Sequence, residues 1–410
     1  MSSLTKTPRD VLLALYVPSA ILQFCQGLLL PVLPLFALSF EVSYGMVGVV
    51  LAAQWVGNLV CDMPVGIAIL RVGRKRAMLS GAGLIAASTL ALVWAPSLPA
   101  VIALRFVSGV GMALWGTSRH SFLAEAVGVE RRGRASSVMG GIGRIAAFVA
   151  PLPGGLIGEH FGLRAPFALY AVLSLGALAA AARWVPADGP APHSREAESG
   201  RRRFASVVRS HYRILAAAGS GALCAQMIRA GRNAVVPLYA AEVVGLDASG
   251  VGLVVSISYG VDMLMFYPAG LVMDRFGRKF AYVPSFAIQS LGMVLIPFTT
   301  SLSGLLAAVV LLGLGNGIGA GTMLTLGSDL APRQARAEFL GIWRFIGDGG
   351  SAGGPLVVGR VADAIGLGMA PFVVAAIGLT GAIILLTLVP ETLRRPAPTP
   401  ASIPDEAEAG

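Results

Sequence analysis

Seven charged side chains are predicted to lie well inside the membrane, within long apolar stretches of the sequence, where a charge needs a structural or functional reason. They are five arginines and two aspartates: Arg105, Arg144, Arg229, Arg232, Arg344, Asp262 and Asp348. A charge at the centre of a bilayer costs at least about 3 kcal/mol, so such residues face the protein interior, pair with one another or bind solutes and protons. These seven residues are therefore the first candidates for a site that handles charged ligands.

Two interpretations of the aspartates stay open. In the first, the charges only satisfy one another, and Asp348 pairs with Arg344 one helical turn earlier. Asp262 then pairs with Arg229 or Arg232 on a neighbouring helix. In the second, Asp348 or Asp262 takes up a proton, with Asp348 slightly favoured, and proton binding biases a conformational equilibrium. Both aspartates are proton-coupling candidates on this second interpretation.

Polar residues within the same stretches are candidates for the lining of a substrate cavity. With the arginines, the candidate set is Gln23, Gln26, Arg144, Gln226, Arg229, Arg232, Asn233, Asn316 and Arg344. Before any pairing, five interior arginines against two aspartates leave an excess of three positive charges. A cavity of that sign disfavours a permanent cation and tolerates an anion or a zwitterion.

The elements that must position these side chains are membrane-spanning helices. The chain has 410 residues, 55% of them apolar and 13% charged, and its mean hydropathy is +0.76. A typical soluble domain has about 25% charged residues, so this composition excludes a soluble or a disordered chain. A helical span takes about 20 residues. Twelve apolar runs reach that length, at 11–38, 45–69, 77–96, 99–120, 136–158, 165–186, 214–240, 248–272, 280–299, 302–322, 339–361 and 370–390.

A long polar break divides these runs into two groups of six. Residues 1–186 are predicted to form one six-helix bundle and residues 214–392 a second one. The break at 187–213 contains three consecutive arginines, and we interpret it as a cytoplasmic linker that could hold an amphipathic helix on the membrane surface. Residues 393–410 are rich in Pro and Ala, end in acidic residues and are expected to be a disordered cytoplasmic tail.

The positive charges predict the orientation in the membrane. The two tails and the loops on their side of the membrane, with the adjoining ends of the runs, hold 23 Lys and Arg residues. The loops on the other side hold two, Arg164 and Arg360. Because cytoplasmic loops carry an excess of Lys and Arg, both termini are expected in the cytoplasm.

The two groups of six runs are copies of one another. A shift of 204 residues superposes the basic loop after the second run on the loop after the eighth run. The same shift places Pro151 on Pro355 and Gly155 on Gly359. Two parallel six-helix repeats are an architecture of secondary transporters, which bind their substrate near the midplane between the repeats.

The repeated basic loops carry the most specific motif in the sequence. The first reads Gly66-Ile-Ala-Ile-Leu70-Arg71-Val-Gly73-Arg74-Lys75, and the second reads Gly270-Leu-Val-Met-Asp274-Arg275-Phe-Gly277-Arg278-Lys279. Both resemble the signature loop of the major facilitator superfamily, Gly-x-x-x-Asp-Arg-x-Gly-Arg-Lys. The resemblance implies twelve helices in two bundles, and it implies that the Asp and Arg of each loop lock the cytoplasmic side through contacts with the opposite half.

One position departs from that signature. Leu70 stands where the family has Asp, and Asp62, about two helical turns earlier, is no obvious substitute. The lock on that side is therefore expected to be weaker. Glu125 and Asp329, in the loops after the fourth and tenth runs, complete the predicted cytoplasmic gate, where they could pair with Arg71 or Arg275.

The acidic-then-basic loops that carry Glu125 and Asp329 resemble those of the family's proton-driven drug-efflux branch, a group of twelve-span antiporters. Three further elements resemble other motifs of the superfamily. Arg105, followed by Gly109 and Gly111, matches an Arg-x-x-x-Gly-x-Gly element whose Arg is associated with proton coupling, although a structural hydrogen-bond role stays open. The antiporter element Gly-x-x-x-Gly-Pro-x-x-Gly-Gly is degraded before Pro151, where Ala146 and Ala150 replace its first two glycines. The copy at 350–359 keeps more of that spacing.

The sequence therefore predicts a secondary transporter, not an enzyme, which exports a small amphipathic or drug-like organic compound by alternating access and proton coupling. The alternative is an organic-anion or metabolite transporter that works by symport or facilitated diffusion. A non-transporting sensor or scaffold on the same fold is a third, less favoured reading.

The expected partners and surroundings follow from this interpretation. We expect a small-molecule substrate, the lipid bilayer of a bacterial inner membrane, a monomeric state, no nucleic acid, no metal and no cofactor, with the proton gradient as the energy source. The sequence contains no Gly-x-x-x-x-Gly-Lys-Ser/Thr loop of an ATP-driven pump.

Overall fold

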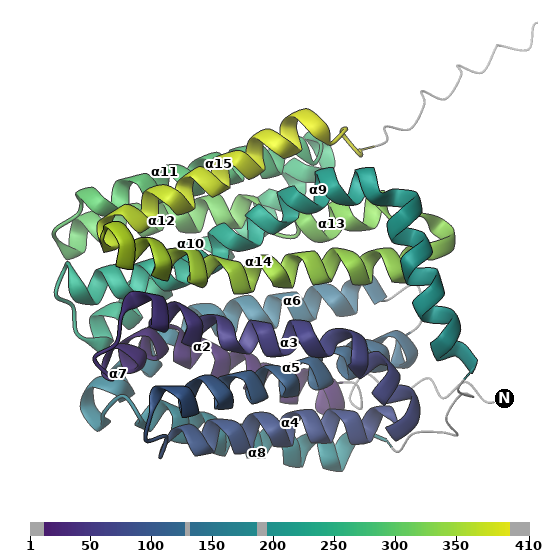
Figure 1. Cartoon of the computed structure of the whole chain (residues 1–410), viewed down its shortest axis with the longest axis horizontal. Coiled ribbons are helices and arrows are strands. Elements are labelled where there is room, and N and C mark those ends of the chain that lie inside the picture. Colours follow the sequence, from purple (N-terminus) through teal and green to yellow (C-terminus); the bar gives the residue numbers. More distant parts are fainter. Residues whose placement is uncertain (1–11, 128–131, 187–194, 394–410) are drawn as a thin grey trace, which may run out of the picture.

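A computed structural model describes residues 12–127, 132–186 and 195–393, and every regular element in these ranges is a helix (Figure 1). The first half contains η1 (Leu12–Tyr16), α2 (Val17–Leu38), α3 (Tyr44–Val72), α4 (Arg74–Leu92), α5 (Leu98–Ala126), α6 (Arg132–Val149), α7 (Pro151–Phe161) and α8 (Ala165–Trp184). The second half contains α9 (Arg195–Glu242), α10 (Ala248–Phe276), α11 (Lys279–Leu295), η3 (Ile296–Phe298), α12 (Leu302–Ile318), α13 (Thr322–Leu330), η4 (Arg333–Ala335), α14 (Arg336–Ile365), η5 (Leu367–Met369) and α15 (Ala370–Leu388).

The twelve predicted runs coincide with twelve helical segments, two of which are broken within the span. Pro151, which has no backbone N–H to continue the helix, separates α6 from α7. Gly321, in the left-handed region with φ of 75°, separates α12 from α13. Ten segments are long and apolar enough to cross a bilayer by length and composition alone. The fold is therefore an all-helical, multi-pass membrane architecture, as predicted.

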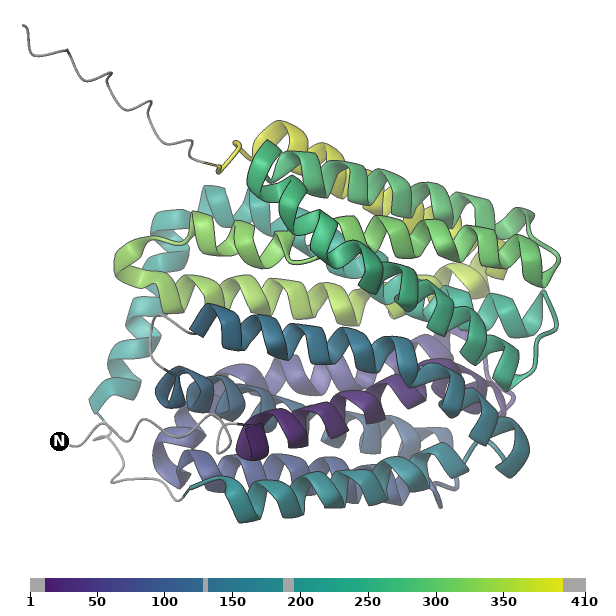
Figure 2. The ribbon, with the colours of Figure 1, turned by 180° about the vertical axis from the view of Figure 1, so that it is seen from behind.

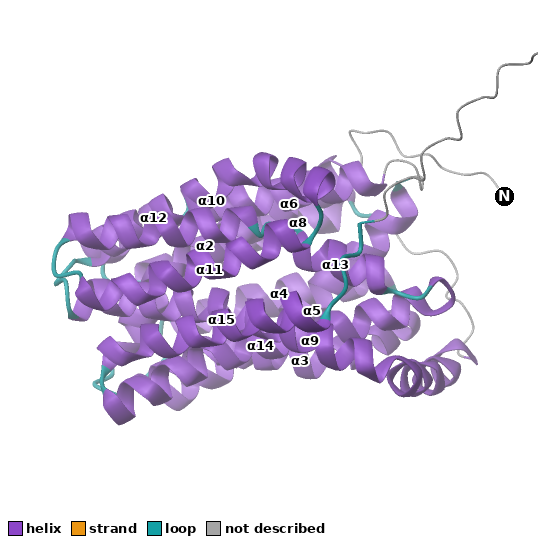
Figure 3. Cartoon of the chain, turned by 90° about the horizontal axis from the view of Figure 1, so that it is seen from above, coloured by secondary structure: helices purple, strands orange, loops and turns teal. Residues whose placement is uncertain are grey.

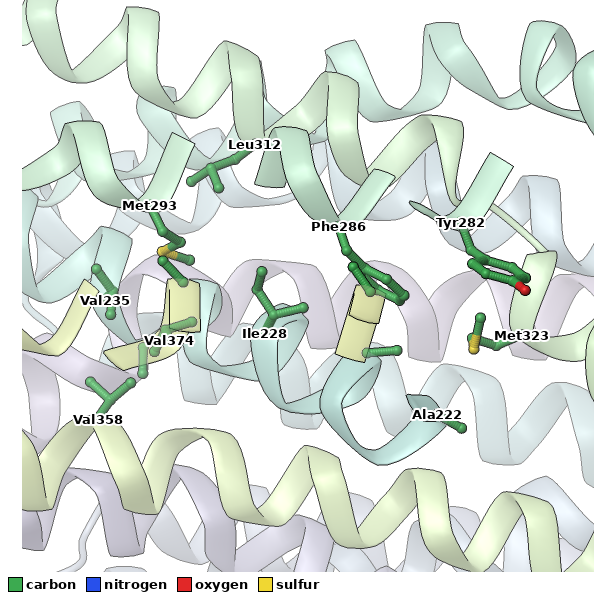
Figure 4. Close-up of a cluster of buried hydrophobic side chains, with 14 of the residues drawn as sticks. Ala222, Ile228, Val235, Tyr282, Phe286, Met293, Leu312, Met323, Val358 and Val374 are labelled. Carbon is green, nitrogen blue, oxygen red and sulfur yellow. The ribbon is translucent and has the colours of Figure 1, made fainter. Parts of the chain in front are cut away.

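Each half has its own apolar core. Ile228, Phe286 and Leu312 belong to a cluster formed entirely by second-half residues (Figure 4). Ile85 and Phe167 belong to a cluster that comes almost entirely from the first half. The halves lie side by side, with the first half in purple and blue below the second half in green and yellow (Figure 1), and the view from behind shows the same division (Figure 2).

The predicted linker is partly helical. Residues 187–194 lie outside the described ranges, but the chain is helical from Arg195 and continues into the seventh span. A kink at His211, with φ of −120° and ψ of 19°, separates the two legs of α9, and the first leg runs across the ends of other helices (Figure 1). The predicted boundary at 213/214 therefore falls beside this kink. The predicted tail lies outside the described residues except for Leu393.

The helices define two ends of the molecule, with most loops at one or the other (Figure 3). We call one the signature end, because it holds the two basic turns at Gly73 and Gly277, the start of η1 and the finish of α15. Gly73 has φ of 91° and Gly277 has φ of 114°, a conformation that favours glycine, which explains this residue type in both turns. We call the other the opposite end.

Candidate functional site

Two cavities lie between the halves. The central cavity, of about 330 Å³, is lined by Gln26, Leu29, Leu30, Leu33, Leu51, Gln54, Trp55, Arg105, Gln226, Arg229, Ala230, Asn233, Ala234, Tyr259, Ser351 and Pro355. The second, of about 340 Å³, lies nearer the signature end, and we call it the signature-side cavity. Its lining is Gln23, Gln26, Gly27, Leu30, Gln54, Trp55, Asn58, Met112, Trp115, Gly116, Arg119, His120, Gly143, Ala147, Arg344 and Asp348. The cavities share Gln26, Leu30, Gln54 and Trp55.

The structure brings most of the predicted cavity residues to these walls. Six of the nine line one or both cavities: Gln23, Gln26, Gln226, Arg229, Asn233 and Arg344. The other three, Arg144, Arg232 and Asn316, are not part of either lining. Arg232 and Asn316 contact the lining residues Tyr259 and Arg229, and Arg144 contacts Asp262. Among the proton-coupling candidates, Arg105 lines the central cavity and Asp348 the signature-side cavity, whereas Asp262 lines neither.

Asp262 is neutralised by an arginine of the other half. Its side chain is buried in α10, and its Oδ1 lies 2.7 Å from Nη1 of Arg144 in α6. Its Oδ2 accepts a hydrogen bond from Nδ2 of Asn316 at 2.8 Å. The prediction that Asp262 pairs with Arg229 or Arg232 was wrong, because the packing of α6 against α10 presents Arg144 first. Asn316 then links Asp262 to Arg229, which donates from Nε to Asn316 Oδ1 at 2.8 Å.

Asp348 belongs to a cluster that joins α14 to α3. The predicted pair is confirmed, since Nε of Arg344 lies 3.6 Å from Oδ2 of Asp348. The same oxygen accepts a hydrogen bond from Nδ2 of Asn58 at 3.1 Å, across the interface between the halves. Nη2 of Arg344 also lies 3.6 Å from Oδ1 of Asp62. Asp62, judged from the sequence to be no substitute for the missing signature aspartate, thus contacts the opposite half after all.

Three interior arginines have no carboxylate partner among the described residues. Arg105 is 5% exposed, and its Nε and Nη1 form no hydrogen bond with a described residue. Arg229 donates only to neutral acceptors: Asn316 Oδ1, Gln226 Oε1 and the Gly319 carbonyl. Arg232 is 3% exposed, and its guanidinium lies 4.4 Å from the ring centroid of Tyr259. The excess of positive charge predicted for the interior therefore collects on these three residues.

The second signature turn is held within its own half. Nε of Arg278 donates to Oδ2 of Asp329 at 3.0 Å, and Asp274 lies 3.8 Å from Arg278. Arg275 stacks on the neighbouring ring of Phe276, with 5.4 Å between guanidinium and ring centroid. The expectation that Asp329 pairs with Arg71 or Arg275 was therefore wrong, because Arg278 is the nearer cation once the turn closes.

The lysines of the two signature turns make the same contact in each half. Nζ of Lys75 donates to the Ala182 carbonyl at 3.0 Å, and Nζ of Lys279 donates to the Leu386 carbonyl at 2.7 Å. Both carbonyls lie in the last turns of the sixth and twelfth spans, where the helix dipole favours a cation. These lysines thus tie each turn to its own bundle.

The structure describes the side chains of only some of the remaining residues of the predicted gate. Arg71 is exposed, and Arg74 lies over the ring of Phe122, with 5.1 Å between guanidinium and centroid. A Cβ added to Gly66 or Gly270 would meet no atom within 4 Å, so neither glycine is required by close packing in this conformation. The side chains of Leu70 and Glu125 lie outside the described residues.

Glu391 stabilises the second signature turn and was not predicted. Its carboxylate accepts hydrogen bonds from the backbone N–H groups of Arg278 at 2.9 Å and Lys279 at 3.0 Å. It also accepts from Thr392 and Leu393. Although burial raises the pKa of a carboxylate, these backbone bonds hold the pKa of Glu391 below its usual value. No periodicity of the sequence marks this residue, since it follows the last span.

The opposite end is closed by two matching contacts between the halves. A Cβ on Gly48 would lie 2.5 Å from the carbonyl oxygen of Pro355, and a Cβ on Gly252 would lie 2.6 Å from that of Pro151. Two further glycines, Gly155 and Gly359, approach the Ala248 and Tyr44 carbonyls too closely for any side chain. The shift of 204 residues relates each of these contacts to the other.

Two carboxylates that the sequence analysis missed complete this closure. Oδ2 of Asp363 accepts from the N–H of Gly45 at 3.0 Å, and Oε2 of Glu159 accepts from the N–H of Ser249 at 3.3 Å. Each carboxylate thus caps the first turn of a helix in the other half, where backbone N–H groups lack partners within the helix. The repeat was the signal that could have found them, since Asp363 and Glu159 are 204 residues apart.

The fold and the paired cavities define a membrane transporter built from two related six-helix bundles. A model of the Major Facilitator Superfamily matches residues 15–223 and again residues 218–408, one match for each half. The chain belongs to the Major Facilitator Superfamily. It is a transporter and not an enzyme, as predicted.

Two relatives show the range of the sequence similarity. An uncharacterised MFS-type transporter of Methanocaldococcus jannaschii is 20% identical over 344 residues, which cover 83% of this chain and 88% of that protein. Multidrug resistance protein D of Escherichia coli is 26% identical over 218 residues, 53% of this chain and 55% of that protein.

Solved structures share the fold at low sequence identity. A POT family transporter in complex with a thioalcohol-conjugated peptide has a TM-score of 0.78 and 13% identity, covering 92% of this chain and 96% of that one. A D-xylose–proton symporter has a TM-score of 0.72 and 17% identity, covering 94% of this chain and 98% of that one. These likenesses support the twelve-helix architecture.

Proposed function

We propose that this transporter couples proton uptake to the export of a small amphipathic or drug-like organic compound, by alternating access between its two bundles. In this proposal the protein is a monomer of the bacterial inner membrane, with the signature end and both termini in the cytoplasm. The observation that carries the coupling is the cluster of Asp348, Arg344, Asn58 and Asp62, which borders the signature-side cavity and joins the two halves.

Protonation of Asp348 changes this cluster in a defined way. The ionised carboxylate attracts Arg344 and accepts the Asn58 hydrogen bond. The protonated carboxyl loses its attraction to Arg344, which keeps its contact with Asp62 alone. Because the Asn58 contact crosses the interface, the two protonation states differ in how firmly α14 holds α3. A ligand that binds two conformations unequally shifts their populations, and here that ligand is the proton.

We assign the structure to the inward-facing state. Its opposite end is sealed by the glycine contacts and by the carboxylates of Asp363 and Glu159. The signature turns, in contrast, are held within their own halves by Asp329 and Glu391. In this state Asp348 has released its proton and the cavities await substrate from the cytoplasm.

Similarity to multidrug resistance protein D supports export, by that protein's name and over about half of each chain. The fold shared with a D-xylose–proton symporter supports proton coupling without fixing the direction. Symport or facilitated diffusion of a metabolite is therefore the competing mechanism that the first experiment must separate.

The experiment uses everted membrane vesicles with an acid interior. A panel of lipophilic cations and small organic anions is added, and collapse of the pH gradient is compared with vesicles that lack the protein. Protein-dependent collapse supports antiport. Compounds that enter proteoliposomes only in the direction of the proton gradient contradict export and establish symport instead.

Variants then test the proton site. Asp348→Asn should lose transport driven by the pH gradient but retain exchange of labelled for unlabelled substrate, because exchange needs no net proton movement. Glu338→Gln, which removes a partly exposed carboxylate of the same helix, is the matched control and should retain both activities. Normal pH-driven transport by Asp348→Asn, or uncoupling by Asp262→Asn alone, would overturn the assignment to Asp348.

A further inference from the structure

The pairing pattern inside the protein removes the acidic groups that a cationic substrate needs. Asp262 is occupied by Arg144, and Asp348 is occupied by Arg344 and Asn58. Among the residues that the structure describes, the lining of the central cavity contains two arginines and no Asp or Glu. A cation in this cavity would therefore meet two like charges and neutral side chains, among them the rings of Trp55 and Tyr259, and no carboxylate of the described lining, which is unfavourable in a low-dielectric interior.

Arg105 is poised to bind an anion. It lines the central cavity and is 5% exposed, and its Nε and Nη1 are buried and have no partner among the described residues. A buried charged donor without a partner is costly, so it gains from a ligand that supplies an acceptor. The guanidinium fork is suited to an oxyanion such as a carboxylate, which it binds through two parallel hydrogen bonds.

Arg229 offers further donors from the second half. It uses three of its five N–H groups on Asn316, Gln226 and Gly319, and these bonds fix the guanidinium at the cavity wall. Two N–H groups remain for a ligand. Arg105 stands on α5 and Arg229 on α9, so an anion that reaches both is held by both bundles.

The rest of the lining describes the body of the ligand. Leu29, Leu33, Leu51 and Trp55 form an apolar wall, and amide side chains such as Gln54 supply neutral hydrogen-bond groups. A volume of about 330 Å³ accommodates a small organic molecule. The lining thus matches a compound with one anionic end and an aliphatic or aromatic body.

We propose that the central cavity binds small amphipathic organic anions, with the anionic oxygens between Arg105 and Arg229 and the apolar body against the leucines and Trp55. This inference deepens the proposed function, because it names the substrate class of the same transport site. It makes the arginines substrate ligands and leaves proton coupling to Asp348. A permanent cation is not a substrate of this site.

Three probes of one shape test the sign of the ligand. The purified protein is titrated with 4-phenylbutyrate, its neutral amide and 4-phenylbutylamine, and binding is measured by thermal stabilisation and calorimetry. The anion should bind at least about tenfold more tightly than the amide, and the amine should not bind. Arg105→Gln and Arg229→Gln should each weaken anion binding about tenfold or more, whereas the exposed control Arg360→Gln should not. Tighter binding of the amine than of the anion overturns the proposal.

A second measurement does not depend on the choice of probe. In a variant with Cys25, Cys61 and Cys224 replaced by Ala, Leu30→Cys places one thiol on the cavity wall. Its rate of reaction with an anionic sulfonatoethyl thiosulfonate is divided by its rate with the cationic trimethylammonium reagent. This ratio is normalised to that of a surface thiol at Ser97, an exposed residue in the loop between α4 and α5. The ratio should exceed one and fall about tenfold in Arg105→Gln. A ratio below one with both arginines present overturns the proposal, even where Arg105→Gln does not fold.

Transport assays with the same probes distinguish a failure of the anion site from a failure of proton coupling. If the anion binds and is carried without any dependence on the pH gradient, the substrate class stands and proton coupling fails. If the amine is carried against a proton gradient while the anion is ignored, coupled export stands and the anion site fails.

Discussion

The two ends of the interface between the halves are built on different principles. At the opposite end, the glycine and carboxylate contacts have copies 204 residues away: Gly48 with Gly252, Gly155 with Gly359, and Glu159 with Asp363. Toward the signature end the residue types of the contacts no longer repeat. Asp348 and Asp262 stand in the second half only, since the matching positions are Arg144 and Asn58.

This difference separates the residues that both halves share from those that only one half carries. Closure of the opposite end depends on backbone approach, which imposes the same demand on both halves, so small residues are kept at both copies. A proton or a substrate binds once per cycle, so its ligands need not be duplicated. The contacts Arg144–Asp262 and Asn58–Asp348 occupy equivalent positions in the repeat but are made by different residue types. The shift of 204 residues places Arg144 on Asp348 and Asn58 on Asp262.

This difference in residue types has a physical consequence. Arg144 meets Asp262, and Asn58 meets Asp348, so each aspartate of the second half faces a polar residue of the first half across the interface. Only the first of these contacts is a direct ion pair between the halves. Asp348 instead forms its ion pair with Arg344 on its own helix. Its contact with the first half is a hydrogen bond from the neutral Asn58, which breaks more easily than the Arg144–Asp262 ion pair. That asymmetry favours Asp348 as the proton site.

The largest effect on transport is expected from side chains added at the close glycine contacts of the opposite end. Gly155→Val and Gly359→Val should each abolish transport, by about 100-fold or more, because any Cβ there overlaps a backbone carbonyl of the other half. Transport in proteoliposomes and cysteine labelling of this end are the measurements. Gly176→Val, at an exposed position where an added Cβ meets nothing, is the control. Tolerance in one copy alone would break the symmetry argument.

Loss of the Arg144–Asp262 pair should come next. Arg144→Gln leaves the buried Asp262 without its cation and should lower stability by about 2–3 kcal/mol, less than a fully buried pair because Arg144 is 22% exposed. Asp262→Asn in the same chain should restore much of the loss. A double-mutant cycle in detergent measures the coupling, expected at about 1–3 kcal/mol. Additive losses would show that the two side chains act independently.

Removal of the Glu391 cap should affect only the second signature turn. Glu391→Gln is expected to cost about 1 kcal/mol near neutral pH, since a carboxylate that accepts backbone N–H groups stabilises a helix start. Because the pKa of Glu391 is lowered in the folded state, this contribution is present above the pKa of the unfolded chain and is lost as the pH falls through the lower pKa of the folded state.

The measurement for this cap is the melting temperature of wild type and variant from pH 7 to pH 3. The difference between them should shrink as the pH falls. Glu338→Gln, a partly exposed carboxylate at the start of α14, serves as the control. A difference that is constant with pH would assign the effect of Glu391→Gln to packing.

The smallest effects are expected from the carboxylates that cap the opposite end. Asp363→Asn and Glu159→Gln should each shift the closed state by about 0.5–1 kcal/mol, a change of a few-fold in population, with Asp363 the larger because its hydrogen bond is shorter. Distance distributions between spin labels on the two halves report this population. Equal effects of Asp247→Asn, which caps α10 from within its own half, would show that crossing the interface is not what matters.

The sequence by itself determined the helices, the repeat and the list of interior charges. Apolar runs of spanning length leave the backbone no other way to satisfy its hydrogen bonds in lipid, so twelve helices followed from composition. The buried arginines and aspartates were visible because a charge within such a run is rare. Even the family was visible, because the turns at Gly73 and Gly277 need both glycine and a fixed spacing of basic residues.

Only the tertiary structure decided which charges meet. Arg144 and Asp262 are 118 residues apart, and Asn58 and Asp348 are 290 apart, so no local pattern links them. Helical periodicity predicted the one pair within a single turn, Arg344 with Asp348. The pairing across bundles depends on how the two halves pack, and so does the absence of a partner for Arg105 among the described residues. Charged side chains interact strongly only within a few ångströms of one another, and the order of residues along the chain does not specify distances between helices.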